Sequence, residues 1–159
     1  MTLIEANEKL DQGLNVRLPE WRGYWFQTKE RKVKALTKDG DIKDAWALAY
    51  MDRLDWEIAE GLDFGWAICA LKSGKLVSRK GWNGSGLFVF MQVPTVIGID
   101  IVPKMQSLPQ AAKDEFALRG ICISYSNQLA LVKPDNSING WAPSSADSLA
   151  EDWQLFESN

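Results

Sequence analysis

An internal repeat constrains this chain most, because two similar segments must each bury an apolar face in a similar way. The segments 2–13 and 63–74 both have the pattern of a helix that begins at a capping residue and ends at glycine, Gly13 or Gly74. At the same 61-residue offset, the further matched pairs are Ala6 with Ala67, Leu10 with Leu71, Val16 with Val77, Trp21 with Trp82 and Gly23 with Gly84. The offset predicts two tandem copies.

We place the copies at 1–60 and 61–159 and predict an α+β fold, in which each copy packs a helix on a small antiparallel sheet. Thr2 and Glu5 have the spacing of a capping box in the first copy, and Asp63 caps the helix of the second. The length of 159 residues suits one ordinary domain or two very small ones.

The second halves of the copies also correspond. The matched segments are 25–26 with 88–89 after a two-residue slip, 45–47 with 140–142, which aligns Trp46 with Trp141, and 54–58 with 151–155. Within 43–60 the spacing of apolar residues also allows one amphipathic helix. We favour the strand, short helix and strand that the repeat predicts.

The copies differ by an insertion at about 94–126 in the second copy. Within it, the segment 107–110 has a helix start and Gly120 a helix stop. The apolar segments 121–125 and 128–132 are predicted strands, separated by Ser-Asn. Residues 134–137, Pro-Asp-Asn-Ser, have the composition of a turn.

Near the C-terminus, Ser144 followed by Asp147 predicts an N-capped helix running to about Glu151, and 152–157 alternates as a closing strand. Eight tryptophans indicate an unusually aromatic core, indoles exposed as stacking platforms, or both. We expect Trp153 in the core. Trp141 lies between Asn-Gly and a proline, so we expect it beside a turn and open to a ligand.

Composition excludes several function classes. The chain has no histidine, which excludes the common zinc spacings, a Ser-His-Asp triad and imidazole acid–base catalysis. A net charge of −3 argues against DNA or RNA as a partner, since phosphate contacts call for a basic face. Cys69 and Cys122 are flanked by apolar residues and are predicted to be buried free thiols. With no long apolar run or signal-peptide pattern, we expect no membrane partner and a cytoplasmic location.

A glycine-rich turn at 79–86 offers a candidate anion site. Its three glycines allow backbone N–H groups to turn inward as a nest, with Arg79 and Lys80 supplying charge. The segment fits neither a phosphate-binding loop nor the dinucleotide fingerprint, and a wide hairpin turn is the alternative. The basic run 29–32 is interpreted as a solvated hairpin end, with a ligand role as its alternative.

Carboxylates are plentiful, but the sequence sets no pair apart as acid and nucleophile, and a nucleophile elbow is missing. The combination of tryptophan, Asn and Ser side chains, an acid and free backbone amides is instead typical of a pocket that binds a nucleotide. Stacking of a base on an aromatic ring contributes on the order of 1 to 3 kcal/mol. These residues favour a binding protein over an enzyme, and no cofactor is expected.

The second copy also resembles a known family, the second type of Thoeris anti-defence protein of phages. The residues that carry the resemblance are Leu-Lys-Ser-Gly-Lys at 71–75, Val77, Arg79, Gly-Trp-Asn-Gly at 81–84, Phe-Val-Phe at 88–90, Asn-Gly-Trp at 139–141, Ser145, Asp147 and Leu-Ala-Glu-Asp-Trp at 149–153. The resemblance covers essentially all of the second copy. The first copy, with Arg22 in place of Asn83, is interpreted as a degenerate repeat.

The resemblance implies a sponge. Family members bind cyclic ADP-ribose-type signals made by bacterial TIR proteins, and some bind cyclic oligonucleotides, in each case without cleavage. They are homo-oligomers with pockets at protomer interfaces. Carried over by position, the expected ligand-binding residues are Arg79, Trp82, Asn83, Asn127, Trp141, Ser145 and Asp147. The alternatives are a protein-interaction or virion component, in which the tryptophans are core and interface anchors, and a signal-degrading enzyme.

Overall fold

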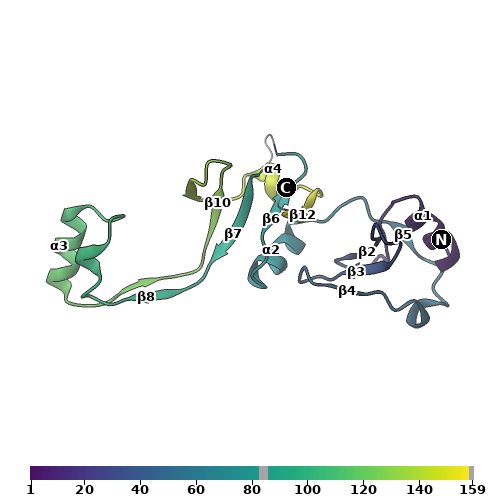
Figure 1. Cartoon of the computed structure of the whole chain (residues 1–159), viewed down its shortest axis with the longest axis horizontal. Coiled ribbons are helices and arrows are strands. Elements are labelled where there is room, and N and C mark those ends of the chain that lie inside the picture. Colours follow the sequence, from purple (N-terminus) through teal and green to yellow (C-terminus); the bar gives the residue numbers. More distant parts are fainter. Residues whose placement is uncertain (83–85, 158–159) are drawn as a thin grey trace.

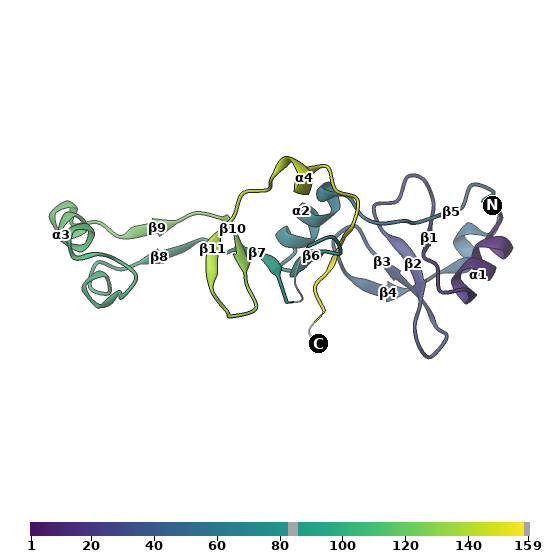
Figure 2. The same cartoon turned by 90° about the horizontal axis from the view of Figure 1, so that it is seen from above.

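The computed structural model describes residues 1–82 and 86–157. The chain is elongated, with the N-terminal unit at one end, a second unit in the middle and a narrow arm at the other end (Figure 1). Seen from above, the same order holds, and α1 and α3 lie at opposite ends of the molecule (Figure 2).

The first unit forms a five-stranded antiparallel sheet with the order β4-β3-β2-β1-β5. Its elements are α1 (Leu3–Asp11), β1 (Val16–Arg17), β2 (Tyr24–Gln27), β3 (Val33–Leu36), β4 (Ile42–Asp44), the 3₁₀ helix η1 (Ala47–Tyr50) and β5 (Glu57–Ile58). Thr2 caps α1 through the predicted capping box with Glu5. Residues 43–60 are therefore strand, short helix and strand, not one amphipathic helix.

The second unit forms another five-stranded antiparallel sheet, with the order β11-β10-β7-β6-β12. Its elements are α2 (Phe64–Lys72), β6 (Val77–Arg79), β7 (Phe88–Gln92), β10 (Gln128–Val132), β11 (Ile138–Gly140), α4 (Ser145–Ser148) and β12 (Trp153–Leu155). Asp63 caps α2 and Ser144 caps α4, as predicted. The helix α4 ends at Ser148, earlier than the predicted Glu151.

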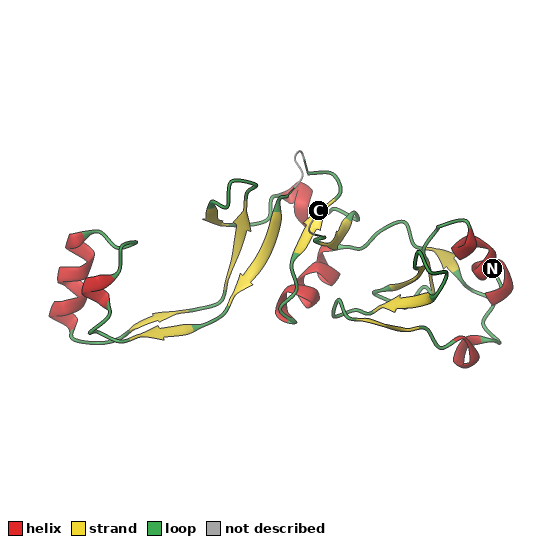
Figure 3. Cartoon of the chain, in the orientation of Figure 1, coloured by secondary structure: helices red, strands yellow, loops and turns green. Residues whose placement is uncertain are grey.

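Helices and antiparallel sheets occur in both units, so the α+β prediction is confirmed (Figure 3). The two sheets have corresponding strand orders, with β1 of the first in the place of β6 of the second and β5 in the place of β12. This correspondence supports a duplication. The duplication itself, with copies at 1–60 and 61–159, stays our proposal.

Strand register corrects one predicted match. Val16 pairs with Trp25, whereas Val77 pairs with Val89, so Trp25 corresponds to Val89 and not to Phe88. A shift of one residue moves a side chain to the other face of a sheet. Sequence similarity alone therefore assigned Trp25 to the wrong residue of β7.

Strand pairing also corrects the residue that the repeat matches to Trp141 in the first copy. The N–H of Trp141 donates to the Leu129 carbonyl, and the equivalent donor in the first unit is Ala45, which bonds the Val33 carbonyl. Trp141 therefore corresponds to Ala45. Trp46, its predicted match, is 72% exposed and lies one residue beyond the equivalent position.

The residues predicted as an insertion form an arm that continues the β7–β10 hairpin (Figure 1). It contains β8 (Thr95–Ile97), the 3₁₀ helix η2 (Val102–Lys104), α3 (Gln110–Arg119) and β9 (Ile123–Tyr125). Gly120 ends α3 in the left-handed region at φ 63°, which confirms the predicted stop. Cys122 beside β9 is exposed and Cys69 is half-buried, so the prediction of buried thiols is wrong. The short arm has too few residues around Cys122 to enclose it.

The two units share a contact that positions the site. Leu36 of β3 packs into the second unit's core with Trp66 and Trp153. The Trp66 indole N–H also donates to the Thr37 carbonyl at 3.0 Å, and the Lys75 ammonium pairs with Asp41 at 2.8 Å. Apolar packing and these polar bonds therefore join β3 and the turn after it to α2.

Candidate functional site

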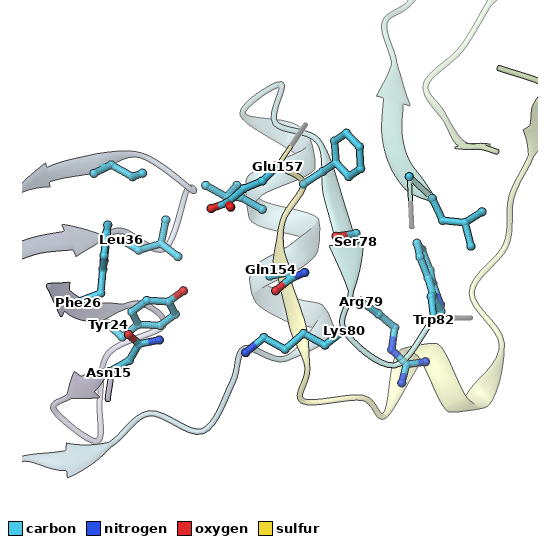
Figure 4. Close-up of a pocket in the computed structure, with 15 residues that line it drawn as sticks. Asn15, Tyr24, Phe26, Leu36, Ser78, Arg79, Lys80, Trp82, Gln154 and Glu157 are labelled. Carbon is cyan, nitrogen blue, oxygen red and sulfur yellow. The ribbon is translucent and has the colours of Figure 1, made fainter. Parts of the chain in front are cut away.

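A groove of about 620 Å³ lies between the two units. In Figure 4, Tyr24, Phe26 and Leu36 of the first sheet face the strands that carry Ser78 and Gln154. The residues that line it are Asn15, Tyr24, Phe26, Leu36, Ile42, Ser78, Arg79, Lys80, Trp82, Gly86, Leu87, Gln154, Leu155, Phe156 and Glu157. A cavity of this size is typical of small-molecule sites, which measure roughly 300–1,000 Å³.

The groove combines aromatic surface with hydrogen-bonding groups. Tyr24, Phe26 and Phe156 supply ring faces, and Gln154 supplies an amide. The Tyr24 phenol is protonated at neutral pH and can donate a hydrogen bond. Burial, followed by the nearby Glu157 carboxylate, raises its pKa further. The aromatic rings and the hydrogen-bonding groups together suit a ligand with a flat ring and polar edges.

Positive charge reaches the groove from β6 and the turn that follows it. Lys80 is exposed, and its ammonium forms no ion pair with any residue that the structure describes. Arg79 also lines the groove, but its guanidinium is occupied: Nη1 bonds Asp147 at 2.7 Å and Nε bonds Asp152 at 2.7 Å. Lys80 is therefore the cation with free donors for an anionic ligand.

Arg79 and Asp147 form the polar centre of the second unit. The Asp147 carboxylate accepts hydrogen bonds from Arg79, from the Trp82 indole N–H at 3.0 Å and from the Ser144 hydroxyl at 2.7 Å. Burial alone would raise the pKa of Asp147, but the bonds from Ser144, Trp82 and Arg79 outweigh it and lower the pKa to about 2. Asp147 is therefore an ionised, fully engaged acceptor that fixes Trp82 and Arg79.

Asp152 completes this centre from the other side. Burial opposes its ionisation, but the bonds from Arg79 and the Gly81 N–H outweigh it and lower the pKa of Asp152. Bonds to both carboxylates raise the pKa of the Arg79 guanidinium. The Gly81 amide, predicted to face an anion as part of a nest, thus already binds a carboxylate of the protein.

Four aromatic rings pack beside the polar centre. Trp82 lies edge-on to Trp153 and Trp141, with ring centroids 5.5 and 6.1 Å apart, and Phe64 tilts against Trp153 at 5.4 Å. Trp153 is 2% exposed, so its predicted core place is confirmed. Trp141 is half-buried behind Trp82 and does not line the groove.

The structure brings together four of the seven predicted site residues. Arg79 and Trp82 line the groove, and Asp147 and Trp141 support them from behind. Ser145 begins α4 with an exposed side chain, and Asn127 is exposed between β9 and β10 where the arm begins; neither lines the groove. Asn83 lies outside the described residues.

Sequence reasoning missed the groove's opposite wall. Tyr24 and Phe26 come from the first unit, which was interpreted only as a degenerate copy. The one available signal was their alternation about Trp25, which turns both side chains to the face opposite that buried indole.

Comparisons with known proteins decide the family. Residues 62–156 match the family described as the Thoeris anti-defense 2-like domain. This chain belongs to the Thoeris anti-defense 2-like family. A relative from Bacillus phage SP01, described as "Thoeris anti-defense 2", is 31% identical over 94 residues, which cover 59% of this chain and 93% of that protein. The match confirms the resemblance and identifies a phage anti-defence protein.

The family match covers the second unit and the arm, and the first unit lies outside it. Residues 1–61 precede the matched range, and the arm lies inside it. Among the described residues, no helix is both long and apolar enough to cross a bilayer. Across the same residues, no cluster of three or more cysteine or acidic side chains is arranged to hold a metal ion.

Proposed function

We propose that this protein sequesters a cyclic nucleotide immune signal, of the cyclic ADP-ribose or cyclic oligonucleotide type, without cleaving it. The observation that carries the proposal is a groove with aromatic walls that is lined by Trp82 and by Lys80, which has no ion pair among the described residues, in a chain of the anti-defence family. A base stacks on a ring of the groove, and a phosphate meets Lys80.

The chemistry around Asp147 supports binding rather than catalysis. A general acid or base must hold or release a proton near neutral pH. Hydrogen bonds hold the pKa of Asp147 at about 2 and lower that of Asp152, so both carboxylates stay ionised and bound to Arg79. They fix the pocket wall in place.

Calorimetric titration of the whole protein against cyclic ADP-ribose isomers and cyclic di- and trinucleotides tests the proposal. We expect tight binding of at least one compound, and chromatography after heat release returns it intact. Recovery of only hydrolysed product identifies an enzyme instead. Absence of binding across the panel refutes the sponge.

Lys80→Glu locates the ligand. Reversing a charge that contacts a phosphate weakens binding about tenfold or more, since attraction becomes repulsion. Lys72→Glu is the matched control, because Lys72 is an exposed lysine of the same unit and does not line the groove. Equal affinities of the two variants place the ligand elsewhere.

A second candidate function is protein interaction, which the arm favours. Val96, Leu118 and Ile121 are 66%, 83% and 63% exposed there, and α3 has no buried residue. Apolar side chains on a projecting arm are typical of contact surfaces.

We also propose that the protein forms a homo-oligomer. Light scattering tests this, and a monomer at all protein concentrations contradicts it.

A further inference from the structure

A second cavity, of about 430 Å³, lies wholly within the first unit and outside the family-matched range 62–156. Its lining residues are Glu20, Trp21, Arg22, Gly23, Trp25, Ala35, Leu36, Thr37, Lys38 and Tyr50. None of the cations or acids of the groove between the units lines it. This cavity is therefore distinct from the site of the proposed function.

Three aromatic rings form much of its wall. Tyr50 lies edge-on to Trp21 and Trp25, with ring centroids 5.0 and 5.8 Å apart, and the two indoles are 5.6 Å apart. Trp25 is only 3% exposed, whereas Trp21 and Tyr50 are half-buried, so the accessible ring surface comes from Trp21 and Tyr50. Such a wall suits a flat ring.

The polar atoms of these rings are free to bind. Within the described residues, no hydrogen bond engages the indole N–H of Trp21 or Trp25 or the hydroxyl of Tyr50. Trp21 and Tyr50 are half-buried, so their indole N–H and hydroxyl are the groups that a ligand can reach. They are donors for a ligand's oxygen or nitrogen atoms.

The rim of the cavity carries two cations, Arg22 and Lys38, of which Arg22 also reaches towards Asp63: a Cβ on Gly65 would lie 3.4 Å from Arg22 Nη1 and 3.2 Å from Asp63 Oδ1. Arg22 and Lys38 are exposed and form no ion pair with a described residue. The one acid in the lining, Glu20, is held by Arg53 through two bonds of 2.7 and 3.0 Å. The rim therefore attracts an anion.

We propose that the first unit binds a planar aromatic ring that carries an anionic group, of which a nucleoside monophosphate is a simple example. The ring contacts Trp21 and Tyr50, and the anion pairs with Arg22 and Lys38. The corresponding position in the second unit cannot do the same, because Asp147, six residues before Trp153, stands where the first unit has Tyr50, six residues before Trp56.

Titration of the whole protein with adenosine 5′-monophosphate, adenosine and inorganic phosphate, followed by calorimetry and ligand-observed NMR, tests this site. We expect the monophosphate to bind at least about tenfold more tightly than adenosine, because only it has both the ring and the anion. Equal binding of adenosine contradicts the role of the cations. Absence of monophosphate binding overturns the proposal.

Charge reversals assign the site. Arg22→Glu with Lys38→Glu is expected to weaken monophosphate binding about tenfold or more, while Lys29→Glu, an exposed lysine of the same unit away from the cavity, leaves it unchanged. Lys80→Glu in the groove also leaves it unchanged. If Lys80→Glu is the variant that weakens binding, the monophosphate occupies the groove and this proposal fails independently of the sponge.

Discussion

The two units share a strand order but have opposite chemistry at their centres. The second unit places Arg79 at the end of β6 and Asp147 in α4, joined at 2.7 Å. At the equivalent positions the first unit has Leu18, which is fully buried, and the aromatic Tyr50. The comparison teaches that one sheet arrangement is completed either by a buried ion pair or by apolar and aromatic packing.

The units also obtain one of their core indoles from different strands. In the first unit Trp25 of β2 packs at 4.8 Å from Trp56. In the second, Val89 stands at that place in β7, and Trp141 after β11 supplies the indole, 6.2 Å from Trp153. The large side chain has moved two strands along the sheet, since β10 lies between β7 and β11, and the exchange roughly conserves side-chain volume.

The largest expected effect comes from breaking the ion pair. Arg79→Leu copies the first unit's residue but leaves Asp147 buried and without its cation, which costs roughly 3 to 5 kcal/mol of unfolding free energy. Adding Asp147→Tyr recovers part of this loss because it removes the more buried of the two carboxylates that Arg79 binds, while Asp152, whose side chain is 30% exposed, remains. Urea unfolding followed by tryptophan fluorescence measures both.

Arg17→Leu is the control for this experiment. Arg17 lies in β1 one strand position before Leu18, and it pairs with Glu57 where the side chains are 30% and 41% exposed. Because water screens that pair, its loss costs about 1 kcal/mol or less. A single Arg79→Leu variant no less stable than Arg17→Leu would show that the two centres do not differ energetically.

Patterns of capping and periodicity predicted most elements but not how the copies align. Thr2, Asp63 and Ser144 marked helix starts correctly because a cap acts locally, through bonds within three residues. Trp46 was matched wrongly to Trp141 because register depends on which carbonyl each N–H meets across the sheet. The groove wall formed by Tyr24 and Phe26 has a different cause: alternation about Trp25 places both side chains on one face, but the groove itself arises from contact between the two units.

An effect of intermediate size is expected from acid, which should lower the stability of the second unit. Asp147 has its pKa lowered from 3.8 to about 2, so the folded state binds this proton less readily than the unfolded chain. Its stabilising contribution is therefore fully present above about pH 4 and is lost as pH falls through 2. Asp147→Asn should lower stability at pH 7 by about 2 kcal/mol and flatten its decline between pH 4 and 2.

Asp114→Asn controls for the general effect of removing a carboxylate, because Asp114 is an exposed residue of α3 whose carboxylate accepts a hydrogen bond from Gln110. Thermal unfolding between pH 2 and 7 compares the three proteins. If Asp147→Asn keeps the full decline of the natural protein while Asp114→Asn does the same, the acid sensitivity originates outside the polar centre.

The smallest effect concerns the contact that joins the two units. Lys75 pairs with Asp41 at 2.8 Å, but the side chains are 35% and 47% exposed, so Lys75→Gln should cost about 0.5 kcal/mol or less. Gly40→Ala, at the same contact, should cost more, because Gly40 has φ +81° and a Cβ there would lie 3.2 Å from that of Ala70. Urea unfolding measures the stability of both variants. If Lys75→Gln is the less stable of the two, charge rather than close packing holds the units together.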